Sequence, residues 1–343
     1  MRVSLFFFAA GGSEDDADRY GLLLDCARLA DDSDVTAIWT PERHFADFGG
    51  LYPNPSLTSA AIAAVTTRVG IRAGSVALPL HDPLRVAEEW AVVDNLSHGR
   101  AGVSFAAGWH RRDFVLRPAN YASRSRDLYE TIGQVRRLWQ GQSLTVAGVD
   151  GQPVSVKVFP RPVQRDLPIW ITSGGSAASV QAAGRAGYGL LTHLVGQPRQ
   201  QLTGSVDHYR RALPSGRGNV VLMLHAFVCD TPADLDALVL PSLKIYLKSS
   251  MELEAANDPL IGEEDGVTAE EESIVLEHAA GRHLDNALIG SVDEIRRRMV
   301  DYAAAGVDEI ACLVDFCVDR ERTLESVRRL CELASAATTA GIG

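Results

Sequence analysis

Residues 168–185, PIWITSGGSAASVQAAGR, contain the unit that decides the fold of this chain. The apolar run 169–172 is typical of a buried strand, and the small residues 177–185 have the spacing of a helix. Ser173, Gly174, Gly175 and Ser176 join the two directly. The sequence therefore predicts a strand, a glycine turn and a helix in immediate succession.

The same alternation of strand and helix extends along the whole chain. Eight β-rich runs alternate with amphipathic stretches; these runs are VSLFFFA (3–9), VTAIWT (35–40), GIRAGSVALPL (70–80), AGVSFAAG (101–108), PIWITSGG (168–175), YGLLTHL (188–194), NVVLMLHAFVCD (219–230) and DEIACLVDF (308–316). Such alternation implies parallel strands with right-handed crossovers, and eight units favour a closed (β/α)8 TIM barrel. An open doubly wound sheet is the alternative, but FFFAAGGSEDD carries acids where its pyrophosphate would lie.

Two stretches depart from this alternation. The segment SLTVAGVDGQPVSVKVF alternates around Asp150-Gly151 and predicts a β-hairpin excursion with a two-residue turn. The acidic stretch from Met251 onward lacks periodicity, so we expect a surface insertion over about 251–284, near the last units. We expect a single TIM-barrel domain over residues 1–343.

Composition excludes several classes of protein. The 343 residues carry a net charge of −11 and are 46% hydrophobic, which is typical of a globular protein and unlike a nucleic-acid-binding or anionic-membrane surface. No apolar run reaches the roughly 20 residues that cross a bilayer. The five cysteines show no metal or disulfide spacing, so we expect buried thiols, no metal and a cytoplasmic location.

Polar residues gather where the predicted strands end. In a barrel of this kind the active site forms at the C-terminal ends of the strands. The candidate residues at these ends are Glu42, Arg43, His44, Gly74, Ser75, Ala107, Trp109, His110, Ser173, Gly174, Gly175, Ser176 and His193. An acid, a base and an imidazole in succession, ERH, can support acid–base chemistry.

Each candidate also has a structural interpretation. The Ser-Gly-Gly-Ser turn at a helix N-terminus suits a phosphate, but Ser176 could simply cap the helix. Trp109 offers a flat wall for a heterocycle, or packs at the rim. His110 could be a solvated loop residue, and His44 and His193 could each be held by a backbone carbonyl without a catalytic role. We expect His81 and His98 to be turn residues, and His278 and His283 lack the spacing of a metal helix.

Taken together, these motifs resemble the bacterial luciferase-like flavin-dependent monooxygenases over nearly the whole chain. The resemblance rests on ERHF-x-x-FG followed by NP, on ALPLHDPLRVAEEWAVVDNLSHGR, on GWHRRDF, on the strand–glycine–helix turn and on GVDEIACLVDF. SFAAGWH, FPRPVQ and LLTHLVGQ resemble more narrowly the subgroup associated with polyketide and nonribosomal-peptide assembly lines.

The resemblance implies a barrel that binds reduced FMN supplied by a separate flavin reductase. Oxygen would add at the flavin C4a atom and then transfer to a natural-product intermediate, either a small molecule or one bound to a carrier protein. A homodimer is the usual arrangement. A deazaflavin-dependent oxidoreductase and a non-catalytic flavin-binding protein of the same fold remain alternatives.

The resemblance also implies roles for residues. Glu42 would lie near the flavin, and Arg43 takes a position where bacterial luciferase has a catalytic histidine, so that role could pass to His44. Gly74-Ser75 matches a cis peptide beside the flavin ring. Ala107 stands where luciferase binds the flavin phosphate with an arginine, which leaves the phosphate to the turn 173–176.

Overall fold

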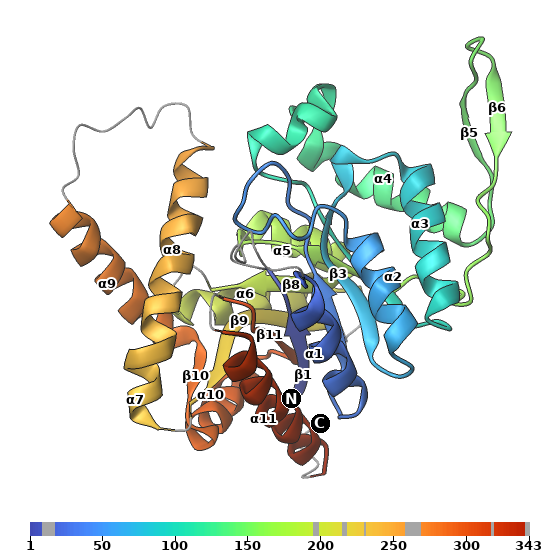
Figure 1. Ribbon diagram of the computed structural model, residues 1–343. Coiled ribbons are helices and arrows are strands. Elements are labelled where there is room, and N and C mark those ends of the chain that lie inside the picture. The colour runs from blue at the N-terminus through green and yellow to red at the C-terminus, as the bar shows by residue number, and fades with distance from the viewer. Residues whose placement is uncertain are drawn as a thin grey trace.

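The computed structural model describes residues 1–8, 18–194, 199–214, 218–229, 231–257, 269–316 and 319–339. Among these residues, eight parallel strands form a ring in which the last strand, β11, returns to the first, β1 (Figure 1). In ring order the strands are β1 (Arg2–Phe6), β2 (Ala37–Thr40), β3 (Gly70–Ala77), β4 (Ala101–Ala106), β7 (Ile169–Thr172), β8 (Gly189–His193), β9 (Val220–Val228) and β11 (Glu309–Leu313). The predicted (β/α)8 barrel is confirmed, and each predicted run contains one of its strands.

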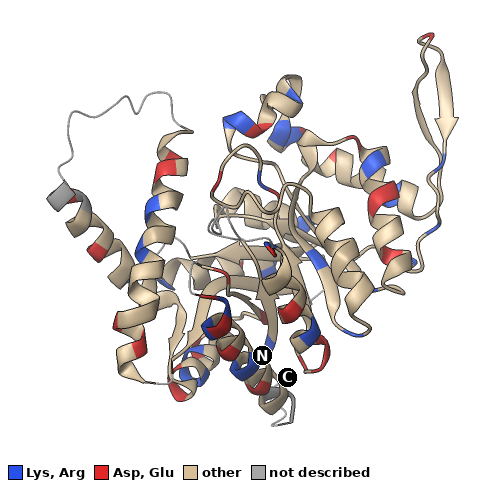
Figure 2. Ribbon diagram, in the orientation of Figure 1, with Lys and Arg blue, Asp and Glu red and all other residues tan. Residues whose placement is uncertain are grey.

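Helices surround this ring in Figure 1. They are α1 (Gly21–Asp31), α2 (Pro55–Val65), α3 (Pro83–Leu96), α4 (Arg124–Trp139), α5 (Ala177–Arg185), α6 (Arg199–Ala212), α7 (Pro232–Asp234), α8 (Leu240–Ala255), α9 (Ala269–Asn286), α10 (Val292–Ala304) and α11 (Arg320–Thr339). Short 3₁₀ segments lie at Leu78–Leu80 (η1), Arg111–Leu116 (η2) and Pro118–Asn120 (η3), and a π-helical segment, η4 (Leu235–Val239), precedes α8. Most charged residues lie on the helices, and the strands are largely uncharged (Figure 2).

Local sequence explains where several helices begin. The Asn54 and Asp82 side chains accept hydrogen bonds from backbone N–H groups in the first turns of α2 and α3, and a proline follows each of them. Ser291 and Glu294 form a capping box at the start of α10. These residues satisfy N–H groups that have no partner within the helix, so the helix starts are encoded locally.

The barrel has two hydrophobic layers. Outward-facing strand residues, such as Ile38, Ile71 and Val103, pack against the helices in one core cluster. Inward-facing Phe6, Trp39, Trp170, Leu191 and Val221 belong to a second cluster that fills the ring and extends to α8 and α9. This alternation follows from the two-residue period of a strand, and it makes the barrel a packed core.

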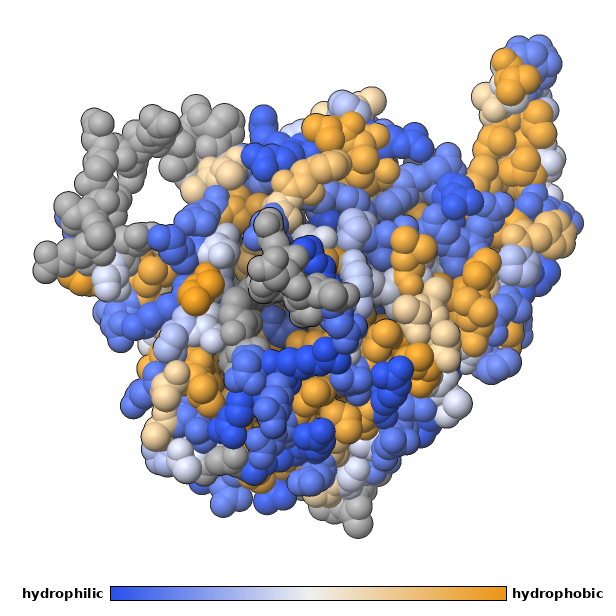
Figure 3. Space-filling model, in the orientation of Figure 1, coloured by the Kyte–Doolittle hydropathy of each residue, from blue (hydrophilic) through white to orange (hydrophobic). Residues whose placement is uncertain are grey.

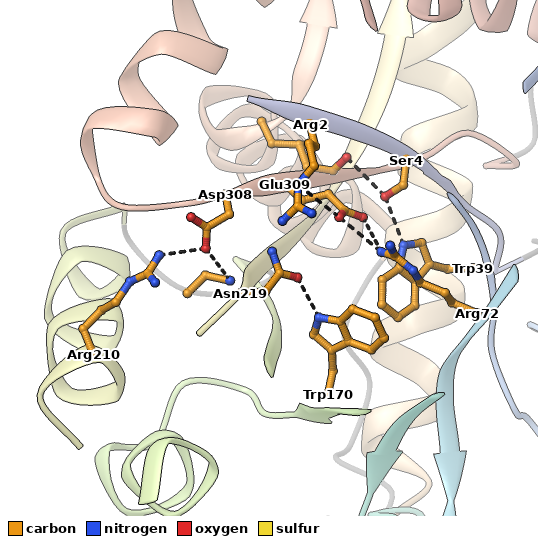
Figure 4. A network of polar contacts seen from close by, with 11 residues as sticks. Arg2, Ser4, Trp39, Arg72, Trp170, Arg210, Asn219, Asp308 and Glu309 are labelled. Carbon is orange, nitrogen blue, oxygen red and sulfur yellow. Dashed lines mark hydrogen bonds and ion pairs between the residues drawn. The ribbon is translucent and has the colours of Figure 1, made fainter. Parts of the chain in front are cut away.

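A buried ion pair closes the N-terminal end of the barrel (Figure 4). Glu309 is fully buried, and its two carboxylate oxygens accept hydrogen bonds from Nη1 of Arg72 at 2.8 and 3.1 Å. The Arg72 guanidinium also lies over the rings of Trp39 and Trp170, at 4.9 and 4.6 Å. Since this end lies opposite the strand ends that carry chemistry, we assign the network to stability.

The predicted hairpin is present, but its turn is longer than the sequence indicated. Strands β5 (Leu144–Ala147) and β6 (Pro153–Val156) pair antiparallel and project from the barrel, with apolar side chains along the projection (Figures 1 and 3). Gly148 N–H donates to the Gln152 carbonyl, and Gly151 N–H donates to the Gly148 carbonyl. Three residues therefore form the loop, because Gly151 adopts a positive φ of 77° and adds a bulge residue after the turn.

The stretch expected to be an insertion, about 251–284, is helical on both sides where it is described. Met251 continues α8 to Ala255, and α9 begins at Ala269; residues 258–268 lie outside the described part of the chain. α8 and α9 bury apolar residues in the same core cluster as β9, although the sequence between Met251 and Leu284 shows no helical periodicity. A short strand after α9, β10 (Leu288–Gly290), adds to the edge of β9.

The expectation of buried thiols is confirmed for Cys26, Cys312 and Cys331, which form no disulfide. Cys317 lies outside the described residues, as do Ala9 to Gly12 at the end of the first strand.

Candidate active site at the barrel mouth

Glu42 lies at the centre of the hydrogen bonds after β2. Its Oε1 accepts hydrogen bonds from Nε2 of His44 at 2.8 Å and Nε2 of His81 at 2.6 Å, and its Oε2 accepts one from the Ala77 N–H at 2.7 Å. Only 1% of the Glu42 side chain is exposed. Burial alone would raise its pKa, but the hydrogen bonds from His44, His81 and Ala77 outweigh burial and lower the pKa. Glu42 is therefore a buried carboxylate that orients two imidazoles.

His81 is a member of this group that sequence reasoning missed. It lies in the bend after η1, as a turn residue should, yet its ring reaches Glu42. Burial alone would lower its pKa, but the hydrogen bond to Glu42 and the charge of that carboxylate raise it. Its position beyond the end of β3 was the available signal, since the strand ends that carry Glu42 and His81 are neighbours in the ring.

Arg43 lies among aromatic rings at the same rim. Its guanidinium carbon is 5.6 Å from the ring centre of Phe8 and 5.4 Å from that of Trp109. The residue is 5% exposed, and its Nε has no hydrogen-bond partner among the described residues. Burial lowers the pKa of Arg43, and the nearby Asp113 charge opposes that effect. The interpretation of Arg43 as a catalytic residue remains a prediction.

Trp109 and His110 follow β4 in different environments. Trp109 is 43% exposed and His110 is 3% exposed, with their rings at a right-angled contact of 5.2 Å. Nδ1 of His110 lies 3.9 Å from Oδ1 of Asp113, which is too long for a hydrogen bond. Neither ring nitrogen of His110 meets hydrogen-bond geometry with any residue that the structure describes. Burial lowers the pKa of His110, which favours a neutral imidazole.

Gly74 and Ser75 form the cis peptide bond that the resemblance implied. A side chain at Gly74 would place its Cβ 2.5 Å from a ring carbon of Phe6, so the barrel core itself requires glycine there. Ala107 follows β4 and packs partly buried against the outer core cluster. Contact of these residues with a flavin remains a prediction.

The turn 173–176 joins β7 to α5 with its own hydrogen bonds. Ser173 Oγ accepts from the Gly175 N–H at 3.2 Å, and Ser176 Oγ accepts from the Ser179 N–H at 3.3 Å. Ser176 therefore caps the helix, and Gly175 has a positive φ of 92°. A cap does not exclude an anion, because other N–H groups of the first turn have no partner within the helix. The predicted phosphate role of Ser173, Gly174, Gly175 and Ser176 remains a prediction.

Two further histidines come from β8 and β9. Nδ1 of His193 is buried with no hydrogen-bond partner among the described residues, and burial lowers the pKa of this residue. His225 Nδ1 lies 2.8 Å from Nε2 of His283 in α9, while His225 Nε2 has no partner in the described part of the chain. Burial lowers the pKa of His283 to about 4 and that of His225 well below its ordinary value. The pairing of His225 with His283 was not predicted.

The mouth as a whole fits a planar ligand with polar edges. In the described part of the chain, buried polar atoms without partners lie on Arg43, His110, Asp113, His193 and His225. Aromatic rings contact Arg43, His110 and His225, and Phe48 lies 4.9 Å from Tyr246 and 5.3 Å from Phe8 between ring centres. Native proteins rarely bury unpartnered polar atoms, so such a group indicates a site that a ligand completes. A flavin ring, which is flat and carries oxygen and nitrogen atoms at its edge, matches this environment.

The structure brings Glu42 into contact with His44 and His81, and Arg43 into contact with Trp109. Within the described part of the chain, Ser173, Gly175 and Ser176 form no hydrogen bond or ion pair with Glu42, His44 or His81. Within the same residues, no cluster of three or more His, Cys, Asp or Glu side chains could hold a metal ion. The helices that the structure describes include none that is both long and apolar enough to cross a membrane.

Comparisons with known proteins identify the family. Residues 1–309 match the family described as Luciferase-like monooxygenase. The oxygenase component of flavin-dependent trigonelline monooxygenase from Acinetobacter baylyi is 26% identical, over 96% of this chain and 93% of the relative. The FMNH(2)-dependent dimethylsulfone monooxygenase of Pseudomonas fluorescens is 25% identical, over 92% and 89% of the two chains.

Solved structures share the fold over nearly the full length. The monooxygenase RslO1 from Streptomyces bottropensis superposes with a TM-score of 0.76 at 24% identity, over 97% of this chain and 98% of that one. An F420-dependent secondary alcohol dehydrogenase, a deazaflavin enzyme, superposes with a TM-score of 0.72 at 14% identity, over 97% and 99%. The fold alone is thus shared by enzymes with different flavin coenzymes, whereas the family match covers most of the sequence. The chain belongs to the luciferase-like monooxygenase family.

Proposed function

We propose that this enzyme is the oxygenase component of a two-component monooxygenase, which uses reduced FMN and O₂ to oxygenate an intermediate of natural-product biosynthesis. The observation that carries the proposal is the group of unpartnered polar atoms within an aromatic mouth. The names of two relatives, an oxygenase component and an FMNH(2)-dependent enzyme, support reduced FMN and a separate flavin reductase as partner. In this proposal the substrate is a small molecule or a group bound to a carrier protein. The protein forms a homodimer, and residues 1–343 of each chain form one domain.

The residues of the mouth would share the work as follows. Gly74, Ser75, Ala107, Trp109 and His193 would surround the flavin ring, and the turn 173–176 would hold its phosphate. Reduced FMN, when bound, supplies the electrons that activate oxygen. Glu42 would accept a hydrogen bond from Nε2–H of His44, which fixes the tautomer of that imidazole and leaves Nδ1 as its basic atom. His110, neutral and shielded by Trp109, can accept a proton, while the aromatic rings exclude water.

Reoxidation of reduced FMN tests the proposal directly. Oxygen-free protein is mixed with photoreduced FMN, oxygen is admitted in a stopped-flow instrument, and the absorbance of oxidised flavin is followed. We expect the protein to delay reoxidation relative to free reduced FMN and to an unrelated protein at equal concentration, because a buried mouth controls water and protons. Unchanged reoxidation together with tight binding of a deazaflavin would reject the proposal in favour of hydride transfer.

A pair of substitutions tests the phosphate assignment. Gly175 has a positive φ, so Gly175→Ala and Gly175→Asp both strain the backbone, the alanine at least as much as the aspartate, and only the aspartate adds a charge. Two like charges about 4 Å apart repel by roughly 4 kcal/mol at a protein surface, so we expect Gly175→Asp to bind FMN at least about tenfold more weakly than Gly175→Ala. Fluorescence titration measures both. Riboflavin, which has no phosphate, should bind the two variants equally, and equal FMN affinities would place the phosphate elsewhere.

A further inference from the structure

Within the part of the chain that the structure describes, the buried Arg43 guanidinium has no hydrogen-bond or ion-pair partner. The residue is 5% exposed, and neither a hydrogen bond nor an ion pair within 4.0 Å joins its side chain to any described residue. Its contacts are with the faces of Phe8 and Trp109, which attract a cation but do not accept hydrogen bonds in the way an oxyanion does. The donor groups of the guanidinium therefore remain available in the mouth.

Neighbouring groups do not neutralise this charge fully. Among the described residues, the Asp113 carboxyl acts to raise the pKa of Arg43, yet it forms no ion pair with Arg43, and its own Oδ1 has no hydrogen-bond partner. Burial raises the pKa of Asp113, although the charge of Arg43 opposes this. Burial lowers the pKa of His110, so its imidazole is neutral and does not add to or offset the charge of Arg43. A buried ion without a close partner destabilises the folded state. Binding of an anion to Arg43 would offset this cost and explains its position here.

The FMN phosphate is not the natural partner of Arg43. Arg43 follows β2, whereas the turn 173–176 follows β7, and β3 and β4 lie between these strands in the ring. A phosphate at that turn would therefore leave Arg43 for a different anion. Arg43 lies beside Glu42 and His44, within the part of the mouth to which we assign proton control.

We propose that Arg43 binds the carboxylate of the organic substrate, so that the enzyme selects substrates that carry an acid group. The planar guanidinium presents N–H groups in a fork that matches two carboxylate oxygens. Phe8 and Trp109 supply apolar faces for the carbon skeleton beside that carboxylate. This inference rests on the proposed function, because it assumes that the substrate enters this mouth.

Paired acids and amides of the same shape provide the probes. The full-length protein is titrated with benzoate and benzamide and with hexanoate and hexanamide, by calorimetry or tryptophan fluorescence. We expect the wild-type protein to bind at least one acid about tenfold more tightly than its amide, and Arg43→Met to lose that preference. Arg112→Met, which removes an exposed arginine of the same rim, should keep it.

The remaining outcomes separate the competing explanations. A preference for the acid that survives in Arg43→Met, or no preference in the wild-type protein, overturns the proposal. If Arg43→Met weakens FMN but not riboflavin, Arg43 holds the flavin phosphate and the proposal is wrong. The variant should be at least as stable as the wild type, because methionine removes a buried unpaired charge; a large fall in Tm would show a structural role instead. A failure of FMN to bind any variant would reject the proposed function while leaving the acid preference measurable.

Discussion

Replacing Arg72 by methionine is expected to lower the free energy of unfolding by about 3–5 kcal/mol. The substitution leaves the Glu309 carboxylate fully buried, with Arg2 as its only remaining cation among the described residues, and Nε of Arg2 lies 3.9 Å away. The cost arises from an uncompensated charge in the barrel core, since methionine fills a similar volume between Trp39 and Trp170. Chemical denaturation of the purified variant measures the change.

Two further variants make this result specific. The double variant Arg72→Met/Glu309→Met should recover most of the lost stability, because replacing a whole buried ion pair by apolar groups is often neutral. Arg85→Met removes ion pairs to Glu88 and Glu89, but its side chain is 66% exposed, so a change below about 1 kcal/mol is expected. Equal losses in Arg72→Met and Arg85→Met would contradict a stabilising role for the buried pair.

Replacing Glu42 by glutamine is expected to destabilise the protein by about 3 kcal/mol, with a pH dependence set by His81. Because folding lowers the pKa of Glu42, its carboxylate stabilises the folded protein above pH 4.5, the ordinary pKa of the group. This stabilisation is lost as the pH falls through the lower pKa of the folded state. Because folding raises the pKa of His81, its imidazolium stabilises the folded protein below pH 6.5, the ordinary pKa of the group. This stabilisation is lost as the pH rises through the higher pKa of the folded state. The difference in stability between wild type and Glu42→Gln should therefore be largest between pH 4.5 and 6.5.

Thermal unfolding at a series of pH values measures this profile. Glu88→Gln serves as the control, because the Glu88 side chain is 41% exposed and should show a small effect at every pH. If the difference in Tm between wild type and Glu42→Gln is constant from pH 4 to pH 9, the hydrogen bonds of Glu42 stabilise the protein and its charge does not. The same variant should also shorten any delay in the reoxidation of reduced FMN, if His44 depends on Glu42 for its orientation.

The barrel was predictable because its pattern is local and repeated. Each barrel strand is an apolar run of a few residues, and a helix with capping residues such as Asn54 or Asp82 follows several of them. The α9 helix was missed because its acidic sequence lacks a clear apolar stripe, and it is held by packing against α8. The hairpin turn was misjudged by one residue because Gly151 serves as a bulge and not as a central turn residue.

The site was predictable only in part. The barrel rule placed Glu42, Trp109 and His193 at one rim, because the ends of parallel strands must meet. It could not show that His81 pairs with Glu42 or that His283 reaches His225, since these contacts join residues from separate elements and depend on side-chain orientation. The absence of a partner for Arg43 could not be read from the sequence either, because it is a property of the packed mouth.

The closure of the ring through β1 and β11 has a consequence for how the protein is made. Ser4 and Ile310 meet across this seam although they are 306 residues apart. At about 5–20 residues per second, the ribosome takes roughly 15–60 s to synthesise that length. During this interval one edge of the apolar β1 strand is unpaired, and Arg72 lacks its ion-pair partner Glu309, which has not yet been synthesised. We therefore expect newly made chains to expose an unpaired strand edge until synthesis is nearly complete, and an edge of this kind is prone to aggregation.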